Sequence, residues 1–273
     1  MINDFVKLCH LYGGLDELVQ AGGGNISIKY IEHDTQKIII KASGYNLSDV
    51  TFDKGYSILD CNCANLNIFY GEKPSIETYF HLFLNKYTVH LHPTLINIFM
   101  CSNSKLPVLA YNHITIDYYK PGLDLSNEIK KKYNNENIIF LKNHGVIFTH
   151  DDIEILKKII NNCYYVFSNY KLSDYENIFY SHPNKNIMKI DYKIILPIIP
   201  YTPDIVIYLF NSILNYNNET YIISDTKYKC YQILEVLKSY IILNNNNNLT
   251  PICYEEVQSL LLRDDEKYRL NKI

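Results

Sequence analysis

The sequence predicts an α/β protein, because helical and strand-like patterns alternate along the chain. Residues 3–20 carry apolar side chains at helical spacing, with a break at a pair of glycines. Residues 26–30 alternate apolar and polar side chains after a run of glycines, which is typical of a strand, and residues 37–42 predict a second strand. The amphipathic stretch from Asp151 to about residue 170 predicts a long helix with acidic residues at its start.

The same patterns place further elements along the chain. Proline and glycine mark the starts of several of them, and short apolar runs indicate strands. We expect further strands at residues 56–59, 66–69, 89–92, 105–111 and on both sides of 143–145, and further helices from Pro74, over 93–101, over 121–133, near 228–240 and at 255–270. The last third of the chain shows no constellation of chemically active residues.

Length and composition limit the class of protein. With 273 residues, the chain can form one large domain, or a domain of about 200 residues with an appendage. Acidic and basic residues are mixed along the chain and the net charge is −3, which argues against nucleic-acid and membrane partners. No apolar run reaches the roughly 18 residues of a transmembrane helix. Seven scattered cysteines without a signal-like segment predict reduced thiols and a cytoplasmic location.

His90 and His92 alternate with apolar Val89 and Leu91 in a strand-like run. Alternate side chains of a strand share a face, so this pair can point both imidazoles at one metal ion. Glu77 lies upstream, at the expected start of a helix, where the helix dipole favours an anion. A simpler interpretation fits the spacing equally well: the histidines form the polar face of a half-buried strand, and Glu77 is an ordinary first-turn acid.

Three glycines run directly into the first predicted strand. Glycines at such a place free the backbone to approach a ligand closely, and Asn25, Ser27 and Lys29 then share one face. The arrangement indicates an anion or phosphate cradle, although a tight turn before a solvated strand face would give the same pattern. Ser43 and Gly44 form another small, accessible corner at the end of the second strand.

A third histidine, His144, stands beside Gly145 at a break between two apolar runs. Together with His90 and His92 it matches the ligand set of a catalytic zinc site that keeps one position open for substrate. A nearby glutamate is the natural proton acceptor in such a site. The chemistry that suits it best is cleavage beside a ketose carbonyl, in which a divalent ion binds the sugar oxygens and stabilises the enediolate.

Six short motifs occur in an order that resembles the class II aldolase and adducin superfamily over residues 1 to about 170. They are GGGNIS at 22–27, KASG at 41–44, PSIE at 74–77, HLH at 90–92, LPVLAY at 106–111 and KNHG at 142–145. The stretches PSIETYFH, YYKPGLDL and EEVQSLLLRDDEKYR further resemble the aldolase portion of predicted rhamnulose-1-phosphate aldolases. The resemblance implies a three-layer fold with a central, mainly antiparallel β-sheet flanked by helices. It assigns residues 1–175 to the catalytic domain and 176–273 to a C-terminal extension packed on the core.

The resemblance also implies a metal centre and its catalytic groups. His90, His92 and His144 match the positions that bind zinc or another divalent metal. Glu77 matches the acid/base that moves the proton on the substrate carbon. Tyr111 matches a tyrosine that acts on the aldehyde oxygen from a neighbouring subunit, which implies a homo-oligomer, typically a tetramer.

The substrate phosphate has its own set of matching positions. Where many sugar-phosphate aldolases have two consecutive serines before the catalytic glutamate, this chain has Ser75 followed by Ile76. Because Ile76 cannot donate a hydrogen bond, the phosphate pocket departs from the family pattern. The matching positions are Gly24, Asn25, Ser43, Gly44 and Ser75.

The activity implied by the resemblance is reversible retro-aldol cleavage of a ketose 1-phosphate to dihydroxyacetone phosphate and a short aldehyde. A pentulose-phosphate 4-epimerase shares the retro-aldol step, but those family members usually carry aspartate where Glu77 stands. A dehydratase acting on a thioribulose phosphate would use the same metal site to expel water. An adducin-like binding module would keep the fold while its ligands degrade, and the retention of all three histidines and the glutamate argues against it.

Overall fold

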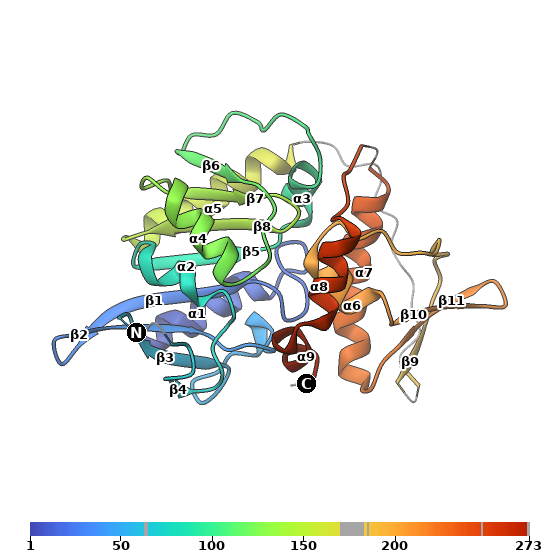
Figure 1. The fold of residues 1–273 in the computed structure, drawn as a ribbon, viewed down its shortest axis with the longest axis horizontal. Coiled ribbons are helices and arrows are strands. Elements are labelled where there is room, and N and C mark those ends of the chain that lie inside the picture. Colours follow the sequence, from blue (N-terminus) through green and yellow to red (C-terminus); the bar gives the residue numbers. More distant parts are fainter. Residues whose placement is uncertain (63–64, 170–182, 185, 247, 272–273) are drawn as a thin grey trace.

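An eight-stranded sheet forms the centre of this computed structural model, among its described residues, which are 1–62, 65–169, 183–184, 186–246 and 248–271. The strand order is β4-β3-β2-β1-β5-β8-β7-β6, and neighbours are antiparallel except for β6 and β7 (Figure 1). The strands are β1 (Asn25–Glu32), β2 (Thr35–Lys41), β3 (Tyr56–Asp60), β4 (Tyr70–Gly71), β5 (Tyr87–Leu91), β6 (His113–Ile116), β7 (Ile138–Leu141) and β8 (Gly145–His150).

Helices cover both faces of this sheet. Neighbouring residues of β7 point to opposite faces of the sheet and pack against different helices. Phe140 belongs to the apolar core between the sheet and helices α1 and α5, whereas Ile139 and Leu141 belong to the core between the sheet and helices α2 and α4. The predicted three-layer α/β fold with a central, mainly antiparallel sheet is therefore confirmed. One face carries α1 (Ile2–Gly13), α3 (Thr94–Met100) and α5 (Ile153–Ser168), and the other α2 (Thr78–Phe83) and α4 (Leu123–Lys132) (Figure 1).

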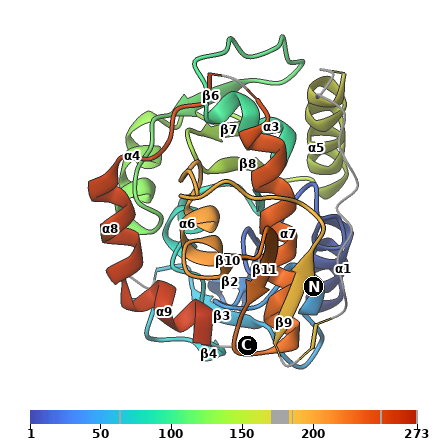
Figure 2. The same cartoon turned by 90° about the vertical axis from the view of Figure 1, so that its right-hand side faces the viewer.

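The C-terminal segment forms a second, smaller assembly beside these layers (Figure 1). Its sheet has the order β10-β11-β9, and its own apolar core surrounds the buried side chains of Tyr208 and Leu237. Figure 2 shows α6 between α7 and α8, and both helices contact it. The elements are β9 (Ile187–Ile190), α6 (Pro203–Leu209), β10 (Ile213–Tyr216), β11 (Glu219–Ile223), α7 (Lys227–Asn244), α8 (Tyr254–Leu262) and α9 (Asp264–Asn271).

The C-terminal assembly holds the glycine-rich loop before β1 by hydrogen bonds. The amide of Ala21 donates to the Glu235 carboxylate at 2.7 Å, and the amide of Gly22 donates to the Tyr208 hydroxyl at 3.1 Å. The predicted boundary near residue 175 lies between 170 and 182, outside the described residues. The division into 1–175 and 176–273 therefore stays a proposal.

The predicted strand at 66–69 is wrong, because these residues belong to a turn. The side chain of Asn65 accepts a hydrogen bond from the amide of Asn67 at 2.9 Å, and its carbonyl accepts one from the amide of Ile68 at 3.1 Å. An asparagine that bonds the backbone two residues on is a common turn former. The strand that comes directly after this turn is the two-residue strand β4.

The predicted strand at 105–111 is also wrong. These residues form an irregular segment in which Val108 is 94% exposed, and the strand β6 begins only at His113, where it pairs with β7. Pro107 cannot donate to a strand partner. A strand pattern needs a neighbouring strand, and the sequence pattern alone does not show where one lies.

Pro74 does not open a helix as predicted, because residues 73–75 are tied to the end of β2. Ala42 forms an isolated bridge with Pro74, and the amide of Ser75 donates to the carbonyl of Lys41 at 3.3 Å. Helix α2 therefore starts at Thr78, and Glu77 is the residue before its first turn. This placement leaves the Glu77 side chain at the end of the sheet.

The helix predicted over 255–270 is two helices, since Arg263 adopts an extended conformation between α8 and α9. The helix predicted from Asp151 is α5, which ends at Ser168, and residue 170 lies outside the described residues. Among the described helices, none has the length and apolar character needed to cross a membrane.

Candidate active site

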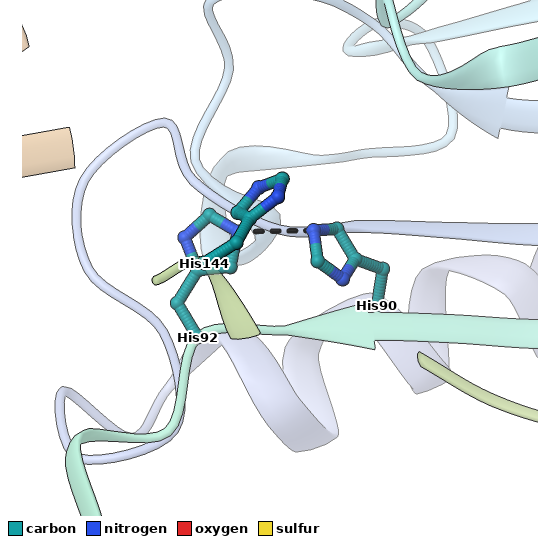
Figure 3. A group of neighbouring side chains, drawn as sticks. All are labelled: His90, His92 and His144. Atoms are coloured by element: carbon teal, nitrogen blue, oxygen red, sulfur yellow. Dashed lines mark hydrogen bonds between the residues drawn. The ribbon is translucent and has the colours of Figure 1, made fainter. Parts of the chain in front are cut away.

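The three candidate metal ligands meet at one end of the central sheet. His90 lies in β5 and His92 directly follows it, while His144 precedes β8, the antiparallel neighbour of β5. The turn before β8 is possible because Asn143 adopts a left-handed conformation, with φ of 52°, which asparagine tolerates. The three histidines are buried, and their candidate ligand nitrogens lie within 4.8 Å of one another (Figure 3).

His90 and His92 each use Nδ1 for a hydrogen bond to a residue outside the histidine cluster, so that their Nε2 atoms point into the cluster. Nδ1 of His90 donates to the carbonyl of Val146 at 3.0 Å, because a carbonyl can only accept. Nδ1 of His92 lies 2.5 Å from a carboxylate oxygen of Asp204. The two Nε2 atoms face each other at 3.0 Å (Figure 3). Tetrahedral zinc bonds of about 2.0–2.1 Å place two nitrogens about 3.3 Å apart, so the pair fits a shared ion.

His144 completes the candidate ligand set as a neutral imidazole. Burial lowers the pKa of His144 to about 3, although Glu77 opposes this effect. Its Nδ1 is buried and has no hydrogen-bond partner. A neutral imidazole with an unpartnered buried nitrogen is suited to coordinating a metal.

Glu77 lies directly beside the histidines. Its carboxylate oxygens are 3.4 Å from Nε2 of His90 and 3.5 Å from Nε2 of His144, and the side chain is 7% exposed. One oxygen, Oε1, is buried without a hydrogen-bond partner. Burial raises the pKa of Glu77, but the neighbouring His90 and His144 outweigh burial and hold that pKa well below its usual range. Glu77 is therefore a carboxylate that faces the candidate metal site.

A buried chain of hydrogen bonds orients Glu77 from behind. Nδ2 of Asn25 donates to Oε2 of Glu77 at 2.9 Å, so Oδ1 of Asn25 accepts from Nε2 of His81. Nδ1 of His81 then accepts from the hydroxyl of Ser27, 2.7 Å away. Burial lowers the pKa of His81 well below its usual range, which agrees with this neutral form. His81 is thus a buried support of the Asn25 and Glu77 pair.

Asp204 was missed by the sequence analysis, which found no active constellation in the last third of the chain. It belongs to α6 and lies beside His92, and both residues are buried, at 3% and 4% exposure. No motif links the two residues, because they are 112 positions apart in the chain. Only the packing of α6 against the glycine-rich loop brings the carboxylate to the histidine.

The predicted phosphate-binding residues line one narrow cavity next to the histidines. The cavity has a volume of about 20 Å³, which is room for roughly one water molecule. It also contains Ile76, the buried Lys41, and two acids of α9, Asp265 and Glu266. The candidate site residues that line it are Gly24, Asn25, Ser43, Gly44, Ser75, Glu77, His92 and His144.

Tyr111 does not line this cavity. It is half-buried and packs against the main apolar core, in the segment that leads to β6. The family resemblance implies that Tyr111 acts in the site of a neighbouring subunit, which a single chain does not test. Its catalytic role stays a prediction.

The chain belongs to the class II aldolase and adducin family. The sequence model of the class II aldolase and adducin N-terminal domain matches residues 3–167, a range that contains the candidate ligands His90, His92 and His144 as well as Glu77. Asp204 and the two α9 acids lie outside it. No protein of curated function matches the chain.

Solved structures share the fold of the matched part. The N-terminal class II aldolase domain of a conserved protein from Thermoplasma acidophilum is 24% identical, with a TM-score of 0.51 over 61% of this chain and 90% of that chain. An L-fuculose 1-phosphate aldolase is 17% identical, with a TM-score of 0.51 over 62% and 84%. An aldolase II superfamily protein from Pseudomonas syringae is 15% identical, with a TM-score of 0.50 over 62% and 74%. At these identities the likeness is one of fold.

Proposed function

We propose that this protein is a metal-dependent aldolase that reversibly cleaves a ketose 1-phosphate to dihydroxyacetone phosphate and a short aldehyde. The observation that carries the proposal is the group of three buried histidines with candidate ligand nitrogens within 4.8 Å. Glu77 lies 3.4 Å from one of them and 3.5 Å from another. Histidines arranged in this way hold zinc at catalytic sites, and another divalent metal is possible.

A bound zinc ion would supply a Lewis acid that polarises the carbonyl and hydroxyl oxygens of the sugar. Glu77 would handle the proton on carbon: as a carboxylate it takes this proton from the carbon next to the ketone carbonyl in the condensation direction, and in cleavage it returns the proton to the same carbon after the carbon–carbon bond breaks. The hydroxyl on the other side of that bond loses its proton and becomes the aldehyde. We assign this second proton to Tyr111 of a neighbouring subunit, which makes a homo-oligomer, a tetramer by the family resemblance, part of the proposal.

The residues that line the narrow cavity support the proposal that the substrate phosphate binds at this place. Gly24 and Gly44 line the cavity with φ of 58° and 86°, which are conformations that glycine adopts readily because it has no side chain. Their bare backbone can approach an anion closely, and Ser43 and Ser75 add hydroxyl groups to the lining. Lys41 contributes the positive charge that this cradle needs beside Ile76, which cannot donate. A cytoplasmic location, where sugar phosphates occur, is part of the same proposal.

Three other activities would use the same site. A pentulose-phosphate 4-epimerase would break and re-form the carbon–carbon bond, but Glu77 replaces the aspartate usual in that group. A sugar-phosphate dehydratase would expel water from the same substrate oxygens. An adducin-like binding module would need no intact ligand set, and the close approach of the candidate ligand nitrogens of three buried histidines argues for the enzyme (Figure 3).

The test is product formation from dihydroxyacetone phosphate and L-lactaldehyde, followed by mass spectrometry. The wild type should form a ketose phosphate. Glu77→Gln should lower the rate by roughly 100-fold or more, because it removes the proton carrier, while metal content stays unchanged. Glu154→Gln is a matched control, since Glu154 is 69% exposed on α5 and forms an ion pair with Lys157 on the same helix.

The outcome separates the candidate functions. Interconversion of ribulose and xylulose 5-phosphates without a new ketose phosphate would favour the epimerase. Loss of water from a thioribulose phosphate would favour the dehydratase. An unchanged rate in Glu77→Gln would contradict the role of Glu77, and a metal-free wild type would favour a binding module.

A further inference from the structure

We propose that Asp204 is a positioning residue for His92, so that a helix outside the matched family domain completes the metal centre. The proposal rests on the metal site described above and deepens it. Asp204 belongs to α6, whereas the family match ends at residue 167. The inference therefore gives the C-terminal assembly a direct part in metal binding.

The contact between the two residues is short and shielded from water. A carboxylate oxygen of Asp204 lies 2.5 Å from Nδ1 of His92, and the side chains are 4% and 6% exposed. A carboxylate can only accept, so Nδ1 of a neutral His92 carries the proton and Nε2 keeps its lone pair. That lone pair faces Nε2 of His90 at 3.0 Å. Asp204 thus selects the imidazole form that can coordinate an ion.

His90 and His92 are held in place by different hydrogen-bond acceptors. His90 lies inside β5, and the carbonyl of Val146 on the neighbouring strand fixes its ring at 3.0 Å. His92 follows the last residue of β5, and Asp204 is the acceptor bonded to its Nδ1. Each of these histidines therefore has one acceptor behind it, a carbonyl for His90 and a carboxylate for His92. Such partners orient metal-binding histidines and raise their basicity.

The carboxylate is held by a rigid element. Every residue of α6 is buried, and the side chain of Thr202 caps its start by accepting from the amide of Ile205. The backbone of Gly23 passes so close that an added Cβ would lie 2.7 Å from the Asp204 carboxylate and 2.8 Å from Nδ1 of His92. The pair is therefore enclosed between α6 and the glycine-rich loop. A carboxylate fixed in this way can set the direction of the histidine ring.

The test compares zinc affinities by chelator competition, using the full chain. Asp204→Asn keeps the shape but removes the charge, and partners of this kind contribute roughly 10- to 100-fold in affinity. We expect zinc binding to weaken by that factor. Asp225→Asn is the matched control, because Asp225 lies in the same assembly, is 84% exposed and pairs with Lys229. The zinc affinity of this variant should equal that of the wild type.

A double-mutant comparison separates positioning from a general loss of structure. If Asp204 acts through His92, adding Asp204→Asn to His92→Ala should weaken zinc binding no further, whereas a general structural effect would add to it. Circular dichroism of the metal-free proteins checks the fold. Wild-type affinity in a folded Asp204→Asn protein, or full additivity in the double mutant, would overturn the inference while leaving the metal site intact. A wild type that binds no zinc would overturn both.

Discussion

Gly23 lies where two side chains of the candidate metal centre leave no room for a third. The glycine run before β1 predicts either close approach of a ligand or a tight turn. At Gly23 the close neighbours are instead the carboxylate of Asp204, the ring of His92 and the carbonyl of Gln20, at 2.7, 2.8 and 2.9 Å from an added Cβ. Gly24 differs, since its φ is 58° and its added Cβ would meet the carbonyl of His90. Each glycine is thus required for a separate reason.

Replacing Gly23 with alanine should damage metal binding. The new methyl group must push Asp204 and His92 apart, because real Cβ atoms do not tolerate such contacts. We expect zinc affinity to fall about tenfold or more in chelator competition, as loss of the supporting carboxylate would cause. Gly14→Ala serves as control, since its added Cβ meets only the carbonyl of His10, at 3.3 Å. Equal zinc affinities of Gly23→Ala and the wild type would argue that the contact between Asp204 and His92 does not contribute to metal binding.

At the scale of single elements, α9 has the clearest relation to the site. Lys73 pairs with Asp265 at 3.0 Å and lies 4.6 Å from the centre of the Tyr268 ring, and Arg263 donates to the carbonyl of Pro121 at 2.6 Å. These contacts hold α9 against the narrow cavity, which Asp265 and Glu266 help to line. The helix therefore brings negative charge to a place where the proposed function needs a phosphate.

Glu266→Gln should strengthen anion binding at the cavity. The side chain is 2% exposed, and an ionised carboxylate in a buried wall repels a phosphate by on the order of 1 kcal/mol, or about fivefold in affinity, whereas a neutral amide does not. Calorimetric titration of the metal-loaded protein with inorganic phosphate measures this change. Glu255→Gln, an exposed change on α8, should have no effect. Unchanged or weaker phosphate binding in Glu266→Gln would show that the cradle is elsewhere.

The elements that could be predicted from the sequence are those with a complete local signal. The start of α5 is one, because Asp152 accepts hydrogen bonds from the amides of Glu154 and Ile155 and an apolar periodic run follows. The start of α2 could not be predicted from Pro74, since pairing between residues 74 and 42 keeps that segment extended. Tertiary contacts overrode local preference there, as they did in the segment 105–111.

At the scale of the whole molecule, the site is assembled from both parts of the chain. The central sheet supplies the histidines, the loops at its end supply Glu77 and the cradle, and the C-terminal assembly supplies Asp204 and the acids of α9. The first two contributions could be predicted, because short motifs carry them. The third could not, because Asp204 acts through a contact across 112 positions and no local pattern records it.

The measurement that tests the central claim most directly is the metal content of the purified wild type and of His90→Ala, His92→Ala and His144→Ala. We predict about one zinc or other divalent ion per chain in the wild type, as a set of three histidine ligands implies. Each single replacement should lose most of that metal and stay folded, since each removes one of the three ligands. A fully folded wild type without metal, or a His92→Ala protein that keeps its metal, would contradict the account.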